Sequence, residues 1–228
     1  MANLYQLSRL AAAVYGDVPP PDGWTSIGTG AEGRFGFKAA AYKGSGETVI
    51  AFRGTTASAG DVAADLQLGA GMNTSHFGQA DDFVQDYLDA DGLAFCGHSL
   101  GGAIAQIVGN RFDRKFATFN APGVAVLASR NVLWSNPAML GVRLAGTVIS
   151  AIAHPVQAAR DVKATFNVVQ GVNICLQYDV VSRIGVHYGK VVRIPGTDAN
   201  PAHQHSISTV VQVLEDNPVG QLRIESYF

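Results

Sequence analysis

The amino-acid sequence predicts an α/β fold, in which a mostly parallel sheet carries helices on both faces. Short apolar segments without strict alternation of apolar and polar residues recur along the chain, and segments of helical periodicity lie between them. Apolar strands of this kind are typical of a parallel sheet, because both of its faces are buried. The 228 residues are 47% hydrophobic and 15% charged, which excludes a disordered chain and provides apolar surface for a large core.

The individual elements are expected from periodicity and from turn residues. Apolar residues recur at helical spacing over residues 4–15, and this helix ends before three consecutive prolines. The turn at residues 43–46 contains two glycines and joins two strands. A later helix is expected to begin with Asp81 and Asp82 near its positive end. The predicted helices are residues 4–15, 81–88, 100–110 and 207–214. The predicted strands are residues 35–42, 48–52, 93–96, 116–119 and 191–194, with a further strand contained within residues 168–178.

Charge is distributed unevenly along the chain. The 44 residues from 116 to 159 contain only two charged side chains, Arg130 and Arg143, whereas residues 61–91 contain seven Asp and no Lys or Arg. The formal net charge of −2 argues against a nucleic-acid partner. The acidic segment is interpreted as a solvated face, with a calcium site as the alternative. The ligands of that alternative site would be Asp81, Asp82 and Asp86.

The charge-poor segment is too short to be a membrane span. Its longest uncharged run, residues 144–159, has 16 residues and includes His154 and Pro155, while a transmembrane helix needs about 20 apolar residues. The first residues lack the charged start and clean apolar run of a secretory signal. We therefore expect no transmembrane helix, and a location in the cytoplasm or export by a route that needs no signal peptide.

One short motif carries a candidate nucleophile. It follows a predicted strand and opens a predicted helix, the strand–turn–helix arrangement that exposes a serine hydroxyl on a sharp turn. Side chains in place of the two flanking glycines would clash with the neighbouring strand and helix, and the helix N-terminus favours negative charge beside the serine. The alternative is a glycine-rich turn without catalysis. The motif is Gly97-His98-Ser99-Leu100-Gly101.

A serine hydroxyl is a poor nucleophile unless a nearby base takes its proton. On this type of fold the order along the chain is serine, acid, histidine. His154 lies inside the apolar segment, and His187 is interpreted as a loop residue. His205 follows the last predicted strand and immediately precedes the closing helix, so it is the predicted base, with His203 as the alternative.

The predicted acid is Asp179. It ends a predicted strand, which places it at the carboxyl edge of the sheet beside the nucleophile, where it would orient His205 and stabilise the imidazolium. The alternative for Asp179 is an ordinary turn aspartate. The other downstream aspartates, Asp113 in a basic turn, Asp161 on a solvated helix and Asp198 in a loop, are interpreted as structural.

Four segments together resemble the class 3 lipase family of α/β-hydrolases, and a bacterial-type member of it. They are Val49-Ile-Ala-Phe-Arg-Gly-Thr-Thr, Gly97-His-Ser-Leu-Gly-Gly-Ala, Thr118-Phe-Asn-Ala-Pro-Gly and Asp179-Val-Val-Ser. The resemblance implies an α/β-hydrolase fold and an oxyanion hole made by the backbone N–H groups of Thr55 and Leu100. It also implies that Cys96 and Cys175 lie two strands apart, about 9–10 Å and too far for a disulfide, so both are expected to be buried free thiols.

The sequence departs from the family pattern at two places. The segment that follows Thr55 keeps Asp65-Leu66 without the tryptophan usual in the family's lid, and Asn120 stands where a glycine is common. The charge-poor stretch is interpreted as an apolar helical insertion, about residues 131–165, in one domain of residues 1–228. Its helix at residues 138–153 would cap the pocket and bind acyl chains, dock on a membrane surface, or simply pack on the sheet.

Together these residues predict a serine hydrolase that cleaves carboxylic ester bonds of lipids, of the lipase or phospholipase A type, through an acyl-enzyme. The expected substrate is a lipid or another ester, with peripheral membrane contact through residues 138–153, and no metal or organic cofactor is expected. A non-catalytic module that binds lipid or a protein partner is one alternative. An acyltransferase that uses the same three residues is the other.

Overall fold

The computed structural model describes residues 2–30, 37–54, 74–124 and 169–228. Several sequence predictions lie outside this part of the chain. They are Thr55, the Asp65-Leu66 segment, His154, Asp161 and the apolar insertion at residues 131–165 with its helix at residues 138–153.

Seven strands form one sheet in which the spatial order follows the chain order. The first three strands pair antiparallel, and every pair from β3 to β7 is parallel. The predicted fold class, a mostly parallel sheet of the α/β-hydrolase type, is confirmed. The strands are β1 (Trp24–Thr29), β2 (Ala39–Gly44), β3 (Glu47–Phe52), β4 (Ala94–His98), β5 (Lys115–Phe119), β6 (Gly171–Leu176) and β7 (Lys190–Ile194).

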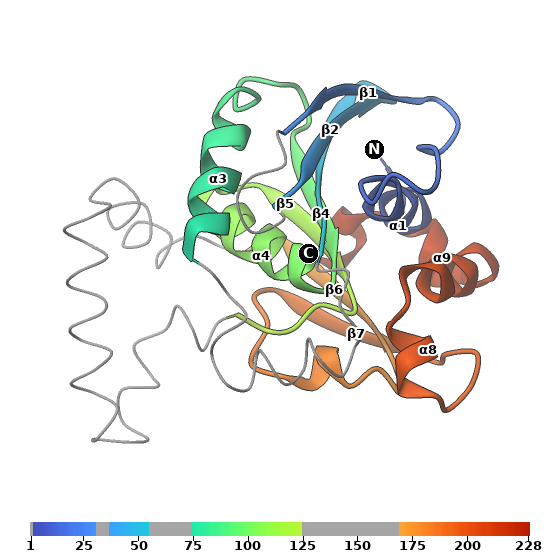
Figure 1. Cartoon of the computed structure of the whole chain (residues 1–228). Coiled ribbons are helices and arrows are strands. Elements are labelled where there is room, and N and C mark those ends of the chain that lie inside the picture. The colour runs from blue at the N-terminus through green and yellow to red at the C-terminus, as the bar shows by residue number, and fades with distance from the viewer. Residues whose placement is uncertain (1, 31–36, 55–73, 125–168) are drawn as a thin grey trace, which may run out of the picture.

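Helices cover both faces of the sheet (Figure 1). On one face, α1 (Leu4–Ala13) and α9 (Ile207–Asp216) pack in one apolar cluster with the central strands. On the other face, α3 (Thr74–Gln85) and α4 (Leu100–Phe112) pack in a second cluster. The sheet therefore separates two apolar cores, as expected for strands that are apolar on both sides.

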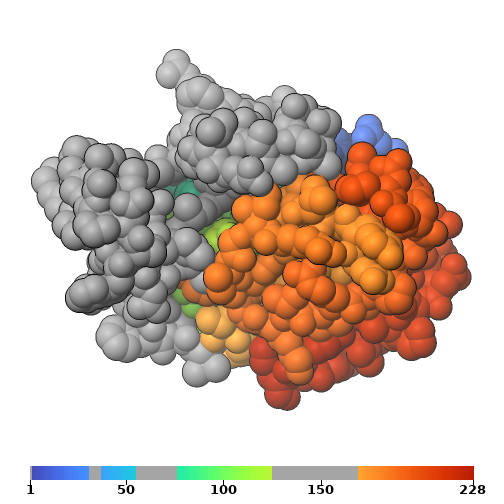
Figure 2. All heavy atoms as spheres, turned by 90° about the horizontal axis from the view of Figure 1, so that it is seen from below, coloured from blue at the N-terminus to red at the C-terminus, as the bar shows by residue number. Residues whose placement is uncertain are grey.

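The C-terminal part of the chain, coloured orange to red, forms most of the described surface on the face seen in Figure 2. After β6 it contains the short helices η3 (Val181–Arg183) and α8 (Pro201–His205), and it ends with η4 (Pro218–Gln221) and η5 (Ile224–Tyr227). No helix in the described ranges combines the length and apolar character needed to cross a membrane.

Local sequence explains why two of these elements begin and end where they do. Asn3 caps α1, since its side chain accepts from the backbone N–H of Gln6 at 2.8 Å while the Gln6 side chain accepts from the N–H of Asn3 at 3.2 Å. Between β2 and β3, Ser45 and Gly46 have φ of 53° and 77°, the left-handed conformation that a two-residue hairpin turn requires. The predicted turn is thus confirmed.

Some predicted boundaries were wrong. The helix predicted at residues 81–88 begins at Thr74, so Asp81 and Asp82 lie in the second half of α3 and not at its positive end. Asp81 is not part of a solvated face either, because its buried carboxylate pairs with Arg111 of α4 at 3.2 Å. The strand predicted from residue 35 starts at Ala39. The strand predicted within residues 168–178 is β6, but it ends at Leu176 and not at Asp179.

Candidate active site

Ser99 lies on a sharp turn between β4 and α4. Its φ of 56° and ψ of −129° are a sparsely populated conformation for a residue with a side chain, and the residue is 1% exposed. The two glycines of the motif permit this turn. A Cβ atom on Gly97 would lie 2.4 Å from the backbone of Gly101, and a Cβ atom on Gly101 would lie 2.0 Å from the carbonyl oxygen of Phe52.

His205 brings its imidazole to the Ser99 hydroxyl from the last residue of α8. This helix begins with Asn200 as its cap, which accepts from the N–H of Ala202 at 3.1 Å, and with Pro201 at its first position. The Nε2 atom of His205 lies 2.9 Å from Oγ of Ser99. The strand-to-helix turn and the C-terminal segment therefore meet at one hydrogen bond, although they are 106 residues apart.

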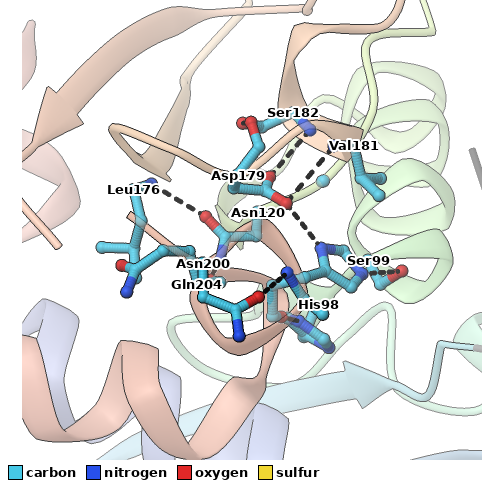
Figure 3. A network of polar contacts seen from close by, with 12 residues as sticks. His98, Ser99, Asn120, Leu176, Asp179, Val181, Ser182, Asn200 and Gln204 are labelled. Atoms are coloured by element: carbon cyan, nitrogen blue, oxygen red, sulfur yellow. Dashed lines mark hydrogen bonds and ion pairs between the residues drawn. The ribbon is translucent and has the colours of Figure 1, made fainter. Parts of the chain in front are cut away.

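Asp179, just after β6, contacts the other ring nitrogen of the same imidazole. In Figure 3, dashed lines join the Asp179 carboxylate to Val181 and Ser182. Its Oδ1 atom is 2.8 Å from Nδ1 of His205. Its two oxygens also accept from the backbone N–H groups of Val181 at 3.3 Å and Ser182 at 2.8 Å. Burial acts to raise the pKa of Asp179, but the hydrogen bonds from His205 and Ser182 outweigh it and the pKa lies below its ordinary value.

These contacts fix the direction of the hydrogen bonds. An ionised carboxylate only accepts, so the His205 proton lies on Nδ1 and Nε2 accepts from the Ser99 hydroxyl. A base in this tautomer can take the proton of the serine hydroxyl. The structure thus brings together three of the residues selected from the sequence, and their geometry is suited to nucleophilic attack by Ser99.

The alternative residues lie elsewhere. His203 pairs with Asp198, and both side chains are nearly half exposed. Nε2 of His187 contacts the carbonyl oxygen of Ala121 at 2.8 Å, while Asp113 is the C-cap of α4. None of these contacts involves Ser99.

The predicted oxyanion donors are described only in part. Leu100 is the first residue of α4, and the first N–H groups of a helix have no partner within the helix. The Leu100 N–H, beside the serine, therefore has no hydrogen-bond partner within α4. Gly54 at the end of the β3 segment lies so close to Ser99 that a Cβ atom on it would be 3.1 Å from the Ser99 Cβ. Thr55, the next residue, lies outside the described residues.

Sequence reasoning missed the role of His98, which it treated only as part of the turn motif. His98 is buried, and its Nε2 lies 2.6 Å from the carbonyl oxygen of His205. Its Nδ1 lies 3.1 Å from the hydroxyl of Tyr15, and the Tyr15 oxygen accepts from the N–H of Gly54 at 3.2 Å. Burial, reinforced by the neighbouring His205 ring, lowers the pKa of His98 from 6.5 to about 3, so this second imidazole is neutral.

Asn120 was noted in the sequence only as a departure from a family pattern. Its φ of 47° explains why either glycine or asparagine fits there, since both tolerate the left-handed region. The side chain adds two buried contacts, in which Nδ2 donates to the carbonyl oxygen of Gln204 at 2.6 Å and Oδ1 accepts from the N–H of Leu176 at 2.8 Å. The unusual residue at this position was the available signal.

Within the described ranges, no group of three or more His, Cys, Asp or Glu side chains is arranged to hold a metal ion. The three aspartates of the alternative calcium site differ in burial. Asp81 is buried and paired with Arg111, while Asp82 and Asp86 are exposed. Cys96 on β4 and Cys175 on β6 are both buried and free, two strands apart as expected.

A mostly parallel sheet, with helices on both faces and a serine on the strand-to-helix turn, defines a protein of the α/β-hydrolase type. The model of a phospholipase-like family, the Tle-like phospholipase domain, matches residues 6–132, and the chain belongs to this family. The match covers the strand-to-helix turn with Ser99. Lipid ester hydrolysis is the general activity that membership in this family supports.

Three solved lipases show overall similarity to the chain. A Rhizomucor miehei lipase–propeptide complex is 16% identical, with a TM-score of 0.49 over 91% of this chain and 74% of the other. A triacylglycerol lipase from Penicillium expansum is 14% identical, with a TM-score of 0.47 over 86% and 80%. A lipase from Rhizopus microsporus var. chinensis is 15% identical, with a TM-score of 0.42 over 78% and 66%. No curated protein matches the chain.

Proposed function

We propose that this protein is a serine hydrolase that cleaves carboxylic ester bonds of lipids, as a lipase or a phospholipase A. The observation that carries the proposal is the unbroken hydrogen-bonded series Ser99 Oγ, His205 Nε2, His205 Nδ1 and Asp179 Oδ1, with donor–acceptor distances of 2.9 and 2.8 Å. Family membership supports the lipid as the substrate class. The more specific resemblance to bacterial-type class 3 lipases stays part of the proposal.

The reaction proceeds in two halves through an acyl-enzyme. Oγ of Ser99 attacks the ester carbonyl carbon while its proton moves to Nε2 of His205, and Asp179 stabilises the imidazolium that forms. When the tetrahedral intermediate collapses, the C–O bond to the alcohol breaks and His205 returns the proton to the leaving alkoxide. His205 then takes a proton from water as the water oxygen attacks the acyl-serine carbonyl carbon. When this second tetrahedral intermediate collapses, the bond from that carbon to Oγ of Ser99 breaks, His205 returns the proton to Oγ, and the carboxylic acid leaves.

Two backbone N–H groups, those of Leu100 and Thr55, hold the oxyanion of both tetrahedral intermediates in this proposal. Such donors contribute about 3–4 kcal/mol each to the transition state. Leu100 is supported by its position at the start of α4. Thr55 is supported by its neighbour Gly54, which packs against Ser99.

The apolar segment completes the proposal. One domain spans residues 1–228, and the insertion at residues 131–165 accommodates acyl chains, with residues 138–153 in peripheral contact with a lipid surface. The proposed chemistry requires neither a metal nor an organic cofactor. Deletion of residues 138–153 should reduce hydrolysis of vesicle phospholipids more than hydrolysis of a soluble short-chain ester.

The central test is replacement of the nucleophile. We expect Ser99→Ala to lower kcat by about 10⁵-fold or more while the protein stays folded, because the hydroxyl that forms the proposed acyl-enzyme is removed. Ser208→Ala is the matched control, since Ser208 is an exposed serine of the neighbouring helix whose hydroxyl contacts Ser206. Hydrolysis of phospholipid vesicles, triacylglycerol emulsion and a soluble ester would be measured for each variant.

A fluorophosphonate probe gives an independent measure of the same residue. Labelling of wild type and Ser208→Ala but not of Ser99→Ala is the expected result. A folded wild type that is neither labelled nor active on any of the three substrates would refute the proposal and favour a non-catalytic module. If the product in the presence of an alcohol is mainly a new ester, the enzyme is an acyltransferase instead.

A further inference from the structure

Two consecutive carbonyl groups at the end of α8 accept hydrogen bonds from buried side chains at the C-terminal ends of β4 and β5. The carbonyl oxygen of Gln204 accepts from Nδ2 of Asn120 at 2.6 Å, and the carbonyl oxygen of His205 lies 2.6 Å from Nε2 of His98. The last carbonyls of a helix have no partner within the helix, so these side chains supply the missing donors. The backbone that carries the predicted base is thereby held at two adjacent points.

The direction of the hydrogen bonds through His98 is determined by its partners. A carbonyl oxygen only accepts, so Nε2 of His98 carries the proton. Because the imidazole is neutral, Nδ1 accepts from the hydroxyl of Tyr15, and the Tyr15 oxygen accepts in turn from the N–H of Gly54. A continuous series of hydrogen bonds therefore connects the residue before Thr55 with the backbone of His205.

Asn120 connects the segment that carries Asp179 with the segment that carries His205. Its Oδ1 accepts from the N–H of Leu176, three residues before Asp179, while its Nδ2 donates to Gln204, the residue before His205. The N–H of Leu176 can only donate, which settles the orientation of the amide. The backbone carbonyl oxygen of Phe119, the residue before Asn120, accepts from the backbone N–H of Ser99 at 3.1 Å.

We propose that His98 and Asn120 are positioning residues that hold His205 in register with Ser99 and Asp179 through the carbonyl oxygens of Gln204 and His205. We call these two side chains and two carbonyl groups the carbonyl clamp. This role rests on the proposed function, because it assigns His98 and Asn120 to the same reaction. Neither side chain touches the reacting atoms, so both act through the backbone of His205.

The clamp should affect the chemical step much more than substrate binding. A small displacement of the imidazole weakens proton transfer to and from Ser99, whereas a bound ester does not require the His205 backbone to stay fixed. We expect His98→Leu and Asn120→Gly to lower kcat by about tenfold to 100-fold. KM should change by less than about twofold, as expected when an interaction acts only in the transition state.

The variants are chosen so that loss of the clamp differs from loss of structure. Glycine adopts the positive φ of residue 120 without strain, so Asn120→Gly removes the amide and keeps the backbone. His98→Gln restores a side-chain N–H donor, and it should recover kcat to within about fivefold of wild type. Thr118→Val is the matched control, since it removes another buried hydrogen bond of the same sheet, 2.7 Å to Asn173, outside the clamp.

A second readout does not depend on activity. The proton between Nδ1 of His205 and Asp179 should give a downfield proton NMR resonance, identified by its absence in His205→Gln. Wild type and Thr118→Val should show this resonance, while His98→Leu and Asn120→Gly should lose it through exchange. A wild type that shows the resonance but hydrolyses no ester would contradict the proposed function and leave the clamp open to the same NMR comparison.

The decisive comparison is between the two clamp variants and the control. If folded His98→Leu and Asn120→Gly keep both kcat and the resonance, or if Thr118→Val loses as much kcat as they do, the carbonyl clamp is wrong. If His98→Leu does not fold, the recovery of kcat in His98→Gln has no reference. The test then compares Asn120→Gly with Thr118→Val at equal thermal stability. A lower kcat and a lost resonance in Asn120→Gly alone then support the clamp.

Discussion

Two histidine–aspartate pairs involve histidines of the same short helix, α8, and they differ in exposure and in their further contacts. In the pair His205–Asp179, which lies 2.8 Å apart, the side chains are 8% and 0% exposed. In the pair His203–Asp198 they are 48% and 44% exposed. The comparison teaches that a close imidazole–carboxylate contact does not define a site. What distinguishes the first pair is its burial and its contact with Ser99.

The two aspartates also owe their low pKa to different causes. The pKa of Asp198 is lowered first by the backbone N–H of Asn200 and then by His203, at the protein surface. For Asp179, burial opposes ionisation, and the hydrogen bonds from His205 and Ser182 overcome it. A solvated pair is screened and contributes little, whereas a buried carboxylate can hold one imidazole in one tautomer.

The largest expected difference is between the two histidines. His205→Ala should lower kcat for ester hydrolysis by about 10⁵-fold, because the proposed base is removed. His203→Ala should change kcat by less than about twofold, because its partner is an exposed surface carboxylate. Steady-state kinetics on a soluble ester check both. Comparable losses in the two variants would mean that His203 also serves the reaction.

The two aspartates should differ next. Asp179→Asn keeps the shape of the side chain but favours the wrong tautomer of His205, and the expected loss in kcat is about 10⁴-fold. Asp198→Asn should alter kcat by no more than about twofold. Since Asp198 also accepts from Asn200 and Gln204, a small decrease in the melting temperature is expected instead. Retention of kcat in Asp179→Asn would remove Asp179 from the proposed machinery.

Much of this fold could be predicted from the sequence because its central strands are apolar on both faces. β4 and β5 are short apolar segments followed by a helix or a loop, and they were placed within a few residues. β1 was not predicted, because it is an edge strand in which only Trp24 is buried and the other five residues are exposed or half-buried. Its Thr-Ser-Ile-Gly-Thr sequence has no apolar alternation.

The boundary of α3 shows a different cause of error. A pair of aspartates favours a helix start on local grounds, since negative charge is stabilised at the positive end of a helix. Asp81 instead finds its partner, Arg111, on a helix that is 30 residues away in sequence. Tertiary pairing of this kind leaves no local pattern, so the sequence alone could not shift the helix to Thr74.

The residues of the candidate site likewise fall into those that the sequence could predict and those that it could not. Ser99, Asp179 and His205 could be selected from chain order and from their positions at strand ends, because those features depend on the fold class. His98 and Asn120 act through carbonyl groups of residues far away in the sequence, and any donor of the right reach could serve there. Contacts with backbone atoms place no demand on the sequence of the partner, which is why sequence reasoning missed them.

The smallest expected effect concerns a third histidine, His98, which can be compared with His205. His98 is as buried as His205, but its partners are a hydroxyl and a carbonyl, and burial lowers its pKa from 6.5 to about 3. Between these values the unfolded chain binds a proton that the native state does not, so stability falls as the pH is lowered, by at most about 1.4 kcal/mol per pH unit. In His98→Gln, the melting temperature measured by circular dichroism should depend less on pH between pH 6.5 and pH 4.5 than it does in wild type. In Thr118→Val, the melting temperature should be lower at every pH, with the same pH dependence as in wild type. Parallel curves for wild type and His98→Gln would show that His98 is not held neutral by its burial.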